Sequence, residues 1–449
     1  MRLRYILGGA AANLYGQGVT ISTQLLSVPV LIAAWGLHGF GLWTMLITVP
    51  TLLLTMDFGY SAAAAGMMSK AIAKGDQNDA LRSLHTAFGV ILLIDLAILI
   101  GAAAFWFHYR DRVFPAFQGL DSEDLRILFS ATPFLLIYVA ISLMSGLVNA
   151  VYRVNNHYPA GVMIFETGRL AEQAAILLLA LAGSGLVVAT MAMVVSRFLF
   201  TSLSALFMLR VTPWAKVSLS HFSRVRLREM LVPALAAMFI PLCVLAGVQG
   251  VTILVGITLS PTLAGGFASV RVLFRMVVQM IGTLTRATVP DFAHVHAQGD
   301  SEATRKIARF TVSVLLAGAI SGSLIVLLCG PWFVNLWTHG KVQLPYSVYV
   351  ILTGHALFGC IWNGLSNLVT GLNQHWRYVP QLLVWNALAI GLLFVTISSA
   401  GLIAAALTIT AIDVLSFVSV FRAWQAVAPA GWWNWRVHKV PQTGVSVGK

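Results

Sequence analysis

The sequence predicts an all-α integral membrane protein with twelve transmembrane helices in two parallel six-helix repeats. Composition, the placement of charges and internal repetition carry this prediction. Of the 449 residues, 58% are hydrophobic and only 10% are charged. Soluble domains usually have about 25% charged and about 45–50% apolar residues. The composition therefore excludes a soluble globular enzyme.

The apolar content is enough for twelve spans. One span uses about 20 apolar residues, so twelve use about 240, and 58% of 449 is about 260. No interval between the expected spans is long enough to hold a soluble catalytic domain, and no cleavable signal is expected at the start. We place the spans near residues 7–35, 40–65, 85–106, 126–150, 160–182, 186–209, 229–256, 263–288, 307–329, 346–371, 379–400 and 402–425.

The basic residues predict the orientation in the membrane. With a cytoplasmic N-terminus, 19 of the 28 Lys and Arg residues fall in cytoplasmic segments and four in outer loops. The positive-inside rule requires this asymmetry, so both termini are expected in the cytoplasm. The excess charge then fixes topology and meets anionic lipid, and no nucleic-acid partner is expected.

Two short signatures recur about half a chain apart. Residues 73–76 (Ala-Lys-Gly-Asp) return at 297–300 (Ala-Gln-Gly-Asp), and residues 146–149 (Gly-Leu-Val-Asn) return at 364–367 (Gly-Leu-Ser-Asn). Both pairs follow equivalent spans, which predicts a duplication of the kind seen in V-shaped, alternating-access transporters. The predicted units are an N-terminal six-helix lobe (1–209), a basic cytoplasmic linker (210–228), a C-terminal lobe (229–425) and a cytoplasmic tail (426–449).

The first span carries a polar stripe. Asn13, Gln17, Thr20, Gln24 and Ser27 share one helical face, and unsatisfied polar groups cost several kcal/mol against lipid. Such residues often bond neighbouring helices. Five on one face favour a water-filled path instead, so we expect Asn13, Gln17 and Gln24 to face substrate.

The eighth span carries a row of arginines. Arg271, Arg275, Gln279, Gly282 and Arg286 fall on one face, and a central arginine costs at least about 2.5–3.5 kcal/mol to insert. Guanidinium groups bind phosphate bidentately. The row therefore predicts a cationic track for a phosphate-bearing substrate, with buried acids as alternative partners and the lipid interface as the alternative location for Arg286.

Spans five and six add further charges. Glu166, Arg169 and Gln173 share a face of span five, with Glu172 three residues from Arg169. These spacings allow intrahelical ion pairs as well as a substrate site. Arg197 in span six has no partner on its own helix and is a candidate for the cationic path.

The remaining membrane-embedded acids are candidates for coupling. Asp95 and Asp413 lie near mid-span, where carboxylates often bind protons or coupling ions. Counter-ions to the five embedded arginines explain them equally well. Glu166 and Asp57 complete the coupling-ion candidates. Neither a metal site nor a cofactor motif is present in the sequence, and the three cysteines lie far apart.

Several loose motifs together resemble one transporter family. The chain is similar to the polysaccharide-transporter branch, the O-antigen-type flippases, of the multidrug/oligosaccharidyl-lipid/polysaccharide (MOP) exporter superfamily. The resemblance covers about residues 7–425. The matching segments are Pro29 with Gly36 and 40–43 (Phe-Gly-Leu-Trp), 57–60 (Asp-Phe-Gly-Tyr), 73–76, Pro290-Asp291 with Gly299-Asp300, and 336–338 (Leu-Trp-Thr).

The resemblance implies a function. Such proteins are taken to move polyprenyl-pyrophosphate-linked oligosaccharides from the inner to the outer leaflet of the bacterial inner membrane, through a cationic cavity. Glycan polymerases or other assembly proteins are then the expected partners, together with membrane lipids and a proton or sodium gradient. A cation-coupled multidrug exporter of the same fold is the nearest alternative, although its path should be acidic or aromatic. Among enzymes, the alternative is a membrane-embedded glycan polymerase or ligase. Such an enzyme would need larger outer loops to hold its catalytic site.

Overall fold

The protein is described by a computed structural model that covers residues 2–54, 59–108, 117–154, 157–372, 374–429 and 432. Within these ranges every regular element is helical and no strand occurs. The predicted all-α fold class is confirmed. The elements are α1 (Arg2–Leu54), α2 (Tyr60–Ala73), α3 (Gln77–His108), α5 (Ser122–Val154), α6 (Tyr158–Leu181), α7 (Leu186–Val211), α8 (Arg224–Thr258), α9 (Pro261–Ala297), α10 (Ser301–Trp337), α11 (Tyr346–Gly371), η2 (His375–Arg377) and α12 (Val379–Val427).

Two of the long helices each contain two spans. Gly36 breaks α1 with φ 71° and ψ 176°, and Gly401 breaks α12 with φ 56° and ψ −137°. Only glycine adopts such left-handed angles at little cost. Nine described helices are long and apolar enough to cross a membrane; α6 is not among them, and it carries three charged residues, Glu166, Arg169 and Glu172. With both breaks counted and α2 extending the second span, the helices match the twelve predicted spans.

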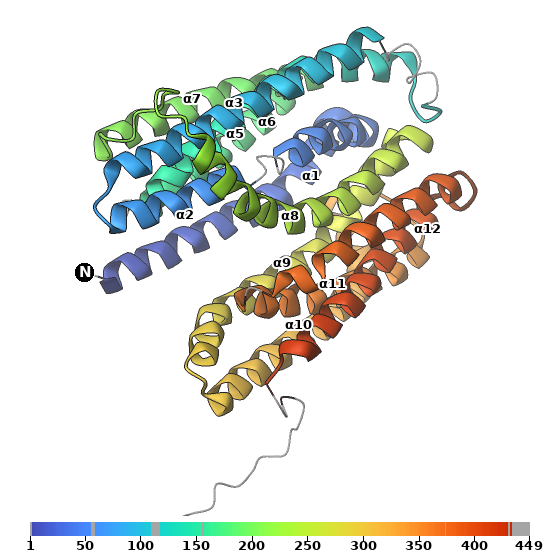
Figure 1. Cartoon of the computed structure of the whole chain (residues 1–449). Helices are drawn as coiled ribbons and strands as arrows, with labels where there is room; N and C mark the ends of the chain where they lie inside the picture. The colour runs from blue at the N-terminus through green and yellow to red at the C-terminus, as the bar shows by residue number, and fades with distance from the viewer. Residues whose placement is uncertain are drawn as a thin grey trace, which may run out of the picture.

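The helices form two bundles, which Figure 1 shows one above the other. The first contains α1, α2, α3, α5, α6 and α7, and the second contains α9, α10, α11 and α12. Helix α8 runs from the first bundle into the second (Figure 1). The bundles share a central hydrophobic core, in which Leu31 and Ile32 of α1 and Phe267 and Phe274 of α9 are almost fully buried.

The repeated sequence signatures build the same turn twice. Gly75 and Gly299 have φ of 78° and 76°, and each follows the residue that caps the end of a helix, Lys74 for α2 and Gln298 for α9. The aspartate that follows caps the next helix: Asp76 Oδ1 accepts from the backbone N–H of Asp79 at 2.9 Å, and Asp300 Oδ1 accepts from that of Ala303 at 2.9 Å. A left-handed glycine followed by an aspartate cap is a compact way to reverse a helix. The recurrence supports the predicted duplication.

The segment 212–223 lies between α7 and α8 and packs on the first bundle. His85 Nε2 lies 2.7 Å from the carbonyl oxygen of Lys216, and Ser223 caps α8 by accepting from the N–H of Arg226. This cap starts α8 at Arg224, earlier than the predicted span. Arg226 then pairs with Asp79 of α3, so the first turn of α8 is held by the first bundle. We call this end of the molecule the linker end.

The opposite end, where Gly36 lies, holds the two bundles together through glycines. A Cβ atom added to Gly41 would lie 1.7 Å from the carbonyl oxygen of Pro261, and Gly265 packs directly against Gly41. The N–H of Gly119 donates to the carbonyl of Ile257 at 2.9 Å. Small residues allow such backbone contact between membrane helices. We call these contacts, together with the two hydrogen bonds that follow, the closed seam.

Two side chains of the second bundle donate to backbone carbonyls of α1. Pro29 has no N–H, so the carbonyl of Leu25 lacks its usual helical donor. Trp337 Nε1 donates to this carbonyl at 2.9 Å. Lys341 Nζ donates to the carbonyl of Ile32 at 3.2 Å, in the last turn before the break at Gly36. The carbonyl that Pro29 leaves without a helical donor thus accepts a hydrogen bond from the other bundle.

Candidate substrate cavity

A polar cavity of about 230 Å³ lies where the two bundles meet. Residues from α1, α6, α8 and α9 line it, so both halves of the chain contribute. We call it the central cavity. Its polar and charged lining residues are Thr23, Gln24, Ser27, Thr44, Thr48, Gln173, Gln249, Thr252, Arg271 and Arg275.

The structure brings two of the predicted stripes together in this cavity. Gln24 and Ser27 come from the first span, and Arg271 and Arg275 come from the eighth. The carbonyl oxygen of the Gln24 side chain is buried and has no hydrogen-bond partner in the described part of the chain. An unpaired buried polar atom that borders a cavity is available for a ligand or water.

The arginines of α9 carry positive charge that the described residues do not neutralise. Arg271 is buried, donates to the carbonyl of Val248 at 3.0 Å and lies over the ring of Phe267. The Nε of Arg275 is buried and has no hydrogen-bond partner among the described residues. No described carboxylate forms an ion pair with Arg271 or Arg275. The buried-acid alternative is therefore not what the structure shows for these two side chains.

Arg169 and Arg197, in contrast, are neutralised by carboxylates. Arg169 pairs with Glu166 at 2.8 Å and also donates to Thr20 Oγ1. Arg197 pairs with Glu172 of α6 at 2.9 Å. Arg197 also donates to the hydroxyl of Tyr138 at 2.6 Å, and the same hydroxyl donates to Glu172 at 2.9 Å. Neither arginine lines the central cavity.

The other predicted substrate residues lie nearer the linker end. Asn13 is exposed and accepts from the hydroxyl of Tyr158 at 3.0 Å. Gln17 is half-buried, and the side-chain oxygen of Gln279 is buried without a hydrogen-bond partner in the described ranges. Arg286 is exposed and donates to Thr283 Oγ1 at 3.2 Å. These residues extend the polar faces away from the cavity.

The coupling-ion candidates have different surroundings. Asp413 is buried, accepts from Trp362 Nε1 at 2.7 Å and contacts His355 Nδ1. Asp95 is half-buried, and its Oδ1 has no partner in the described ranges. Glu166 is held in the pair with Arg169. Asp57 lies outside the described residues.

Asp413 belongs to a second, smaller cavity of about 130 Å³ inside the second bundle. Arg271 and Arg275 line this cavity as well as the central one. We call it the arginine–carboxylate cavity. Sequence reasoning missed its residues His355, Trp362, Asn363 and Asn386, although His355 and Trp362 stand seven residues apart and thus share a face of α11 with Gly359 between them.

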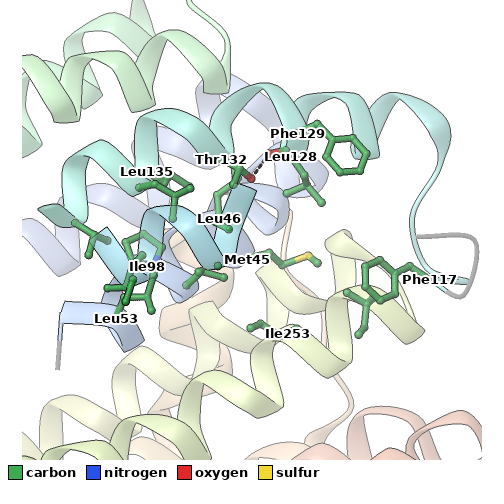
Figure 2. Close-up of a pocket in the computed structure, with 18 residues that line it drawn as sticks. Met45, Leu46, Leu53, Ile98, Phe117, Leu128, Phe129, Thr132, Leu135 and Ile253 are labelled. Atoms are coloured by element: carbon green, nitrogen blue, oxygen red, sulfur yellow. Dashed lines mark hydrogen bonds between the residues drawn. The ribbon is translucent and has the colours of Figure 1, made fainter. Parts of the chain in front are cut away.

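A third cavity of about 470 Å³ is almost wholly apolar. Figure 2 shows its lining, including Leu46 and Leu53 of α1, Leu128 of α5 and Ile253 of α8. The hydroxyl of Thr132, its one hydroxyl-bearing residue, donates to the carbonyl of Leu128 at 2.7 Å (Figure 2). The described lining therefore offers apolar contact, from hydrocarbon groups and the Met45 thioether. We call it the apolar cavity.

The apolar and central cavities lie on two sides of the same pair of segments. The half of α1 after Gly36 gives Thr44 and Thr48 to the central cavity but Met45 and Val49 to the apolar one. Helix α8 divides in the same way, with Gln249 and Thr252 facing the central cavity and Ile253 and Ile257 the other. Thr48 of α1 donates to Gln249 of α8 at 3.4 Å, a contact that joins the two segments on the side of the central cavity.

Sequence comparison finds neither a matching protein-family model nor a matching curated protein. Solved structures do match. An inward-facing structure of a MATE-family multidrug resistance transporter of the MOP superfamily superposes with a TM-score of 0.76 at 14% identity, covering 90% of this chain and 94% of that one. An outward-facing MATE structure gives 0.65 at 14% identity, covering 94% and 95%.

The lipid II flippase MurJ, in an inward closed conformation, also matches. Its TM-score is 0.69 at 11% identity, and the match covers 92% of this chain and 87% of that one. At these identities the comparison shows the fold alone. The chain is therefore a multi-pass membrane protein that has the fold of the MOP-superfamily transporters.

Proposed function

We propose that the protein is a flippase that moves a polyprenyl-pyrophosphate-linked oligosaccharide from the cytoplasmic to the outer leaflet for surface polysaccharide synthesis. One observation carries the proposal: Arg271 and Arg275 border a cavity between the bundles and have no carboxylate partner among the described residues. Desolvated guanidinium groups bind phosphate strongly and bidentately. The pyrophosphate of the substrate supplies the missing negative charge.

The rest of the central cavity suits the sugars. Gln24, Gln173 and Gln249, with the neighbouring threonine and serine hydroxyls, supply both donors and acceptors. Sugar hydroxyls need such mixed partners. The side-chain amide of Gln173 already donates to Ser27 Oγ at 3.0 Å, which holds this wall of the cavity in place.

The apolar cavity supports the lipid part of the substrate. A long isoprenoid chain has no polar group, and the described lining offers it none. Because α1 and α8 separate this cavity from the central one, we expect the head group and the chain of one molecule to lie on two sides of this wall. Thr48 and Gln249 close this wall on the side of the central cavity, and we propose that the linkage passes between α1 and α8 there.

The charge asymmetry gives the orientation. The linker end carries the segments with most of the basic residues, so by the positive-inside rule we expect it to face the cytoplasm. The closed seam then lies toward the outside. The TM-score is higher for the inward-facing MATE structure than for the outward-facing one, and this supports a state that is open toward the cytoplasm. We place the protein in the bacterial inner membrane, where a proton or sodium gradient and glycan-assembly proteins are available as partners.

The test is mass spectrometry of lipid-linked glycans in cells that lack the protein and are complemented with variants. Loss of the protein should cause one polyprenyl-pyrophosphate oligosaccharide to accumulate where reagents outside the cell cannot reach it. Arg275→Gln should reproduce this accumulation at normal protein level, because it removes the unpaired guanidinium. Arg126→Gln, an exposed arginine on α5, is the matched control and should complement fully.

The outcomes separate the alternatives. Full export by the Arg271→Gln/Arg275→Gln double variant contradicts the anion site. Accumulation of the same lipid on the outer leaflet indicates a polymerase or ligase instead. No accumulation, with raised sensitivity to cationic drugs, indicates a multidrug exporter. The MATE-like fold favours this last alternative, whereas two unneutralised arginines in the cavity oppose it.

A further inference from the structure

A buried histidine–aspartate pair lies in the arginine–carboxylate cavity and has no part in the anion site proposed above. Asp413 is 7% exposed and His355 is 8% exposed. His355 Nδ1 contacts Asp413 Oδ2, and Trp362 Nε1 donates to Asp413 Oδ1 at 2.7 Å. Asp413 has no arginine or lysine ion-pair partner in the described part of the chain. The imidazole, when it is protonated, is thus the only cation that pairs with Asp413 there.

The other groups that face this pair are few. From α9, Arg271 and Arg275 line the cavity. From α8 comes the thiol of Cys243, and Cys360 of α11 is buried in the same hydrophobic cluster. From α12, Asn386 lines the cavity, is 6% exposed and keeps its side-chain oxygen without a partner in the described ranges. The two arginines are the only charges besides the pair in the described lining.

The same two arginines also border the central cavity. They therefore stand between the histidine–aspartate pair on one side and the space for the substrate on the other. Charges interact strongly in a membrane-embedded interior, where the effective dielectric constant is far below that of water. Any change of charge on the pair acts on the guanidinium groups that would hold an anion.

We propose that His355 and Asp413 form a proton-binding pair whose occupancy sets the affinity of Arg271 and Arg275 for an anionic group in the central cavity. This inference rests on the proposed function. With the proton bound, imidazolium and carboxylate balance each other. When His355 Nε2 releases the proton to water, the pair keeps one negative charge, which attracts the guanidinium groups and opposes the anion.

Binding of the anion and of the proton are therefore linked. By thermodynamic reciprocity, a proton that raises the affinity for the anion is itself bound more tightly when the anion is present. The affinity falls when the pair loses its proton. The anion brings a proton with it and gives it up on release.

The experiment is isothermal titration calorimetry on the full-length protein in detergent, with geranylgeranyl pyrophosphate as the probe and sodium-free buffers. Between about pH 6 and pH 8, where a histidine switch operates, the affinity of the wild type should fall by about fivefold or more. The measured enthalpy should also depend on the ionisation enthalpy of the buffer, because protons are taken up with the probe.

Two variants should change this behaviour in opposite directions. Asp413→Asn removes the negative charge, so the probe should bind tightly across the whole pH range. His355→Gln leaves the carboxylate without its imidazolium, so binding should be weak across the range. Glu302→Gln, the same carboxylate-to-amide change at an exposed site on α10, should titrate like the wild type. Because every protein meets the same probe, titration of the pyrophosphate itself cancels in the comparison.

The outcomes are separable from those of the proposed function. If Asp413→Asn keeps the full pH dependence and buffer dependence of the wild type, the proton-binding role is overturned while the anion site stands. If the wild type fails to bind the probe at any pH, the anion site on which both proposals depend is overturned. Should His355→Gln fail to fold, the Asp413→Asn comparison still decides.

Discussion

The membrane-embedded arginines are of two kinds, those that pair with a carboxylate and those that do not. Arg169 and Arg197 each have a carboxylate within ion-pair distance on α6, whereas Arg271 and Arg275 have none in the described ranges. A buried charge that already has its counter-ion contributes to structure, and one that lacks it is available to a ligand. We therefore expect the paired arginines to stabilise the fold and the unpaired ones to be the better candidates for the proposed substrate site.

The Arg197–Glu172 pair should matter for stability. Both side chains are largely buried, at 11% and 8% exposure, so Arg197→Ala leaves a buried carboxylate without its cation. We expect this change to lower the free energy of unfolding by about 3–5 kcal/mol, seen as a lower midpoint in thermal unfolding in detergent. The Arg197→Met/Glu172→Met double variant should recover most of the loss. If the double variant is as unstable as the single one, the cost does not come from the unpaired charge.

At the scale of elements, α1 depends on the second bundle. Pro29 leaves the Leu25 carbonyl without a helical donor, and Trp337 of α10 provides one from across the seam. Gly36 then ends the first span shortly after this point. Pro29 and Trp337 therefore act on the same carbonyl: the proline removes the N–H that would bond it, and the indole N–H replaces that donor.

This coupling predicts a double-mutant result. Trp337→Phe should destabilise the closed seam by about 0.5–1.5 kcal/mol, the usual net value of a hydrogen bond. In a Pro29→Ala background the Leu25 carbonyl regains a backbone donor, so the same change should have a smaller effect. Labelling of a Thr44→Cys reporter in the central cavity, from the outer side and with Cys329→Ser, measures how often the seam opens. Equal effects in both backgrounds contradict the coupling.

The elements also show how far the sequence alone reaches. Hydropathy predicts the helices because each span has to satisfy its own backbone in lipid, and the arginine row of α9 is visible in one helix's periodicity. His355 and Asp413 stand 58 residues apart and Thr48 and Gln249 stand 201 apart. No spacing rule connects such pairs, because the packing of different helices decides them. For the same reason the sequence left the partners of Arg271 and Arg197 open.

At the scale of the whole molecule, the two bundles touch through backbone at one end and enclose the polar cavity beside that contact. Gly41, Gly265 and Gly119 permit this closeness. This backbone contact leaves no room for a side chain at Gly41, so the seam is either in contact or open. The fold is therefore suited to two discrete states rather than a graded opening.

Gly41→Ala should prevent the seam from closing, since its Cβ would lie 1.7 Å from the Pro261 carbonyl oxygen. We expect the Thr44→Cys reporter to become accessible from the outer side and transport to fall to background. Gly66→Ala, where a Cβ meets no atom within 4 Å, is the matched control and should behave like the wild type. An inaccessible reporter in Gly41→Ala would show that the bundles close in another way.

The seam of glycines also has an electrical consequence. If the linker end faces the cytoplasm, as proposed, the closed seam separates the cavity from the outer solution, and the backbone contact between Gly41 and Pro261 is part of that barrier. Cells keep ions and protons at unequal concentrations across this membrane, and even a narrow wet gap would conduct them. Where backbone meets glycine, the seam closes to van der Waals distance and leaves no such gap. Expression of Gly41→Ala should therefore depolarise cells, a cost to the whole membrane from one added methyl group.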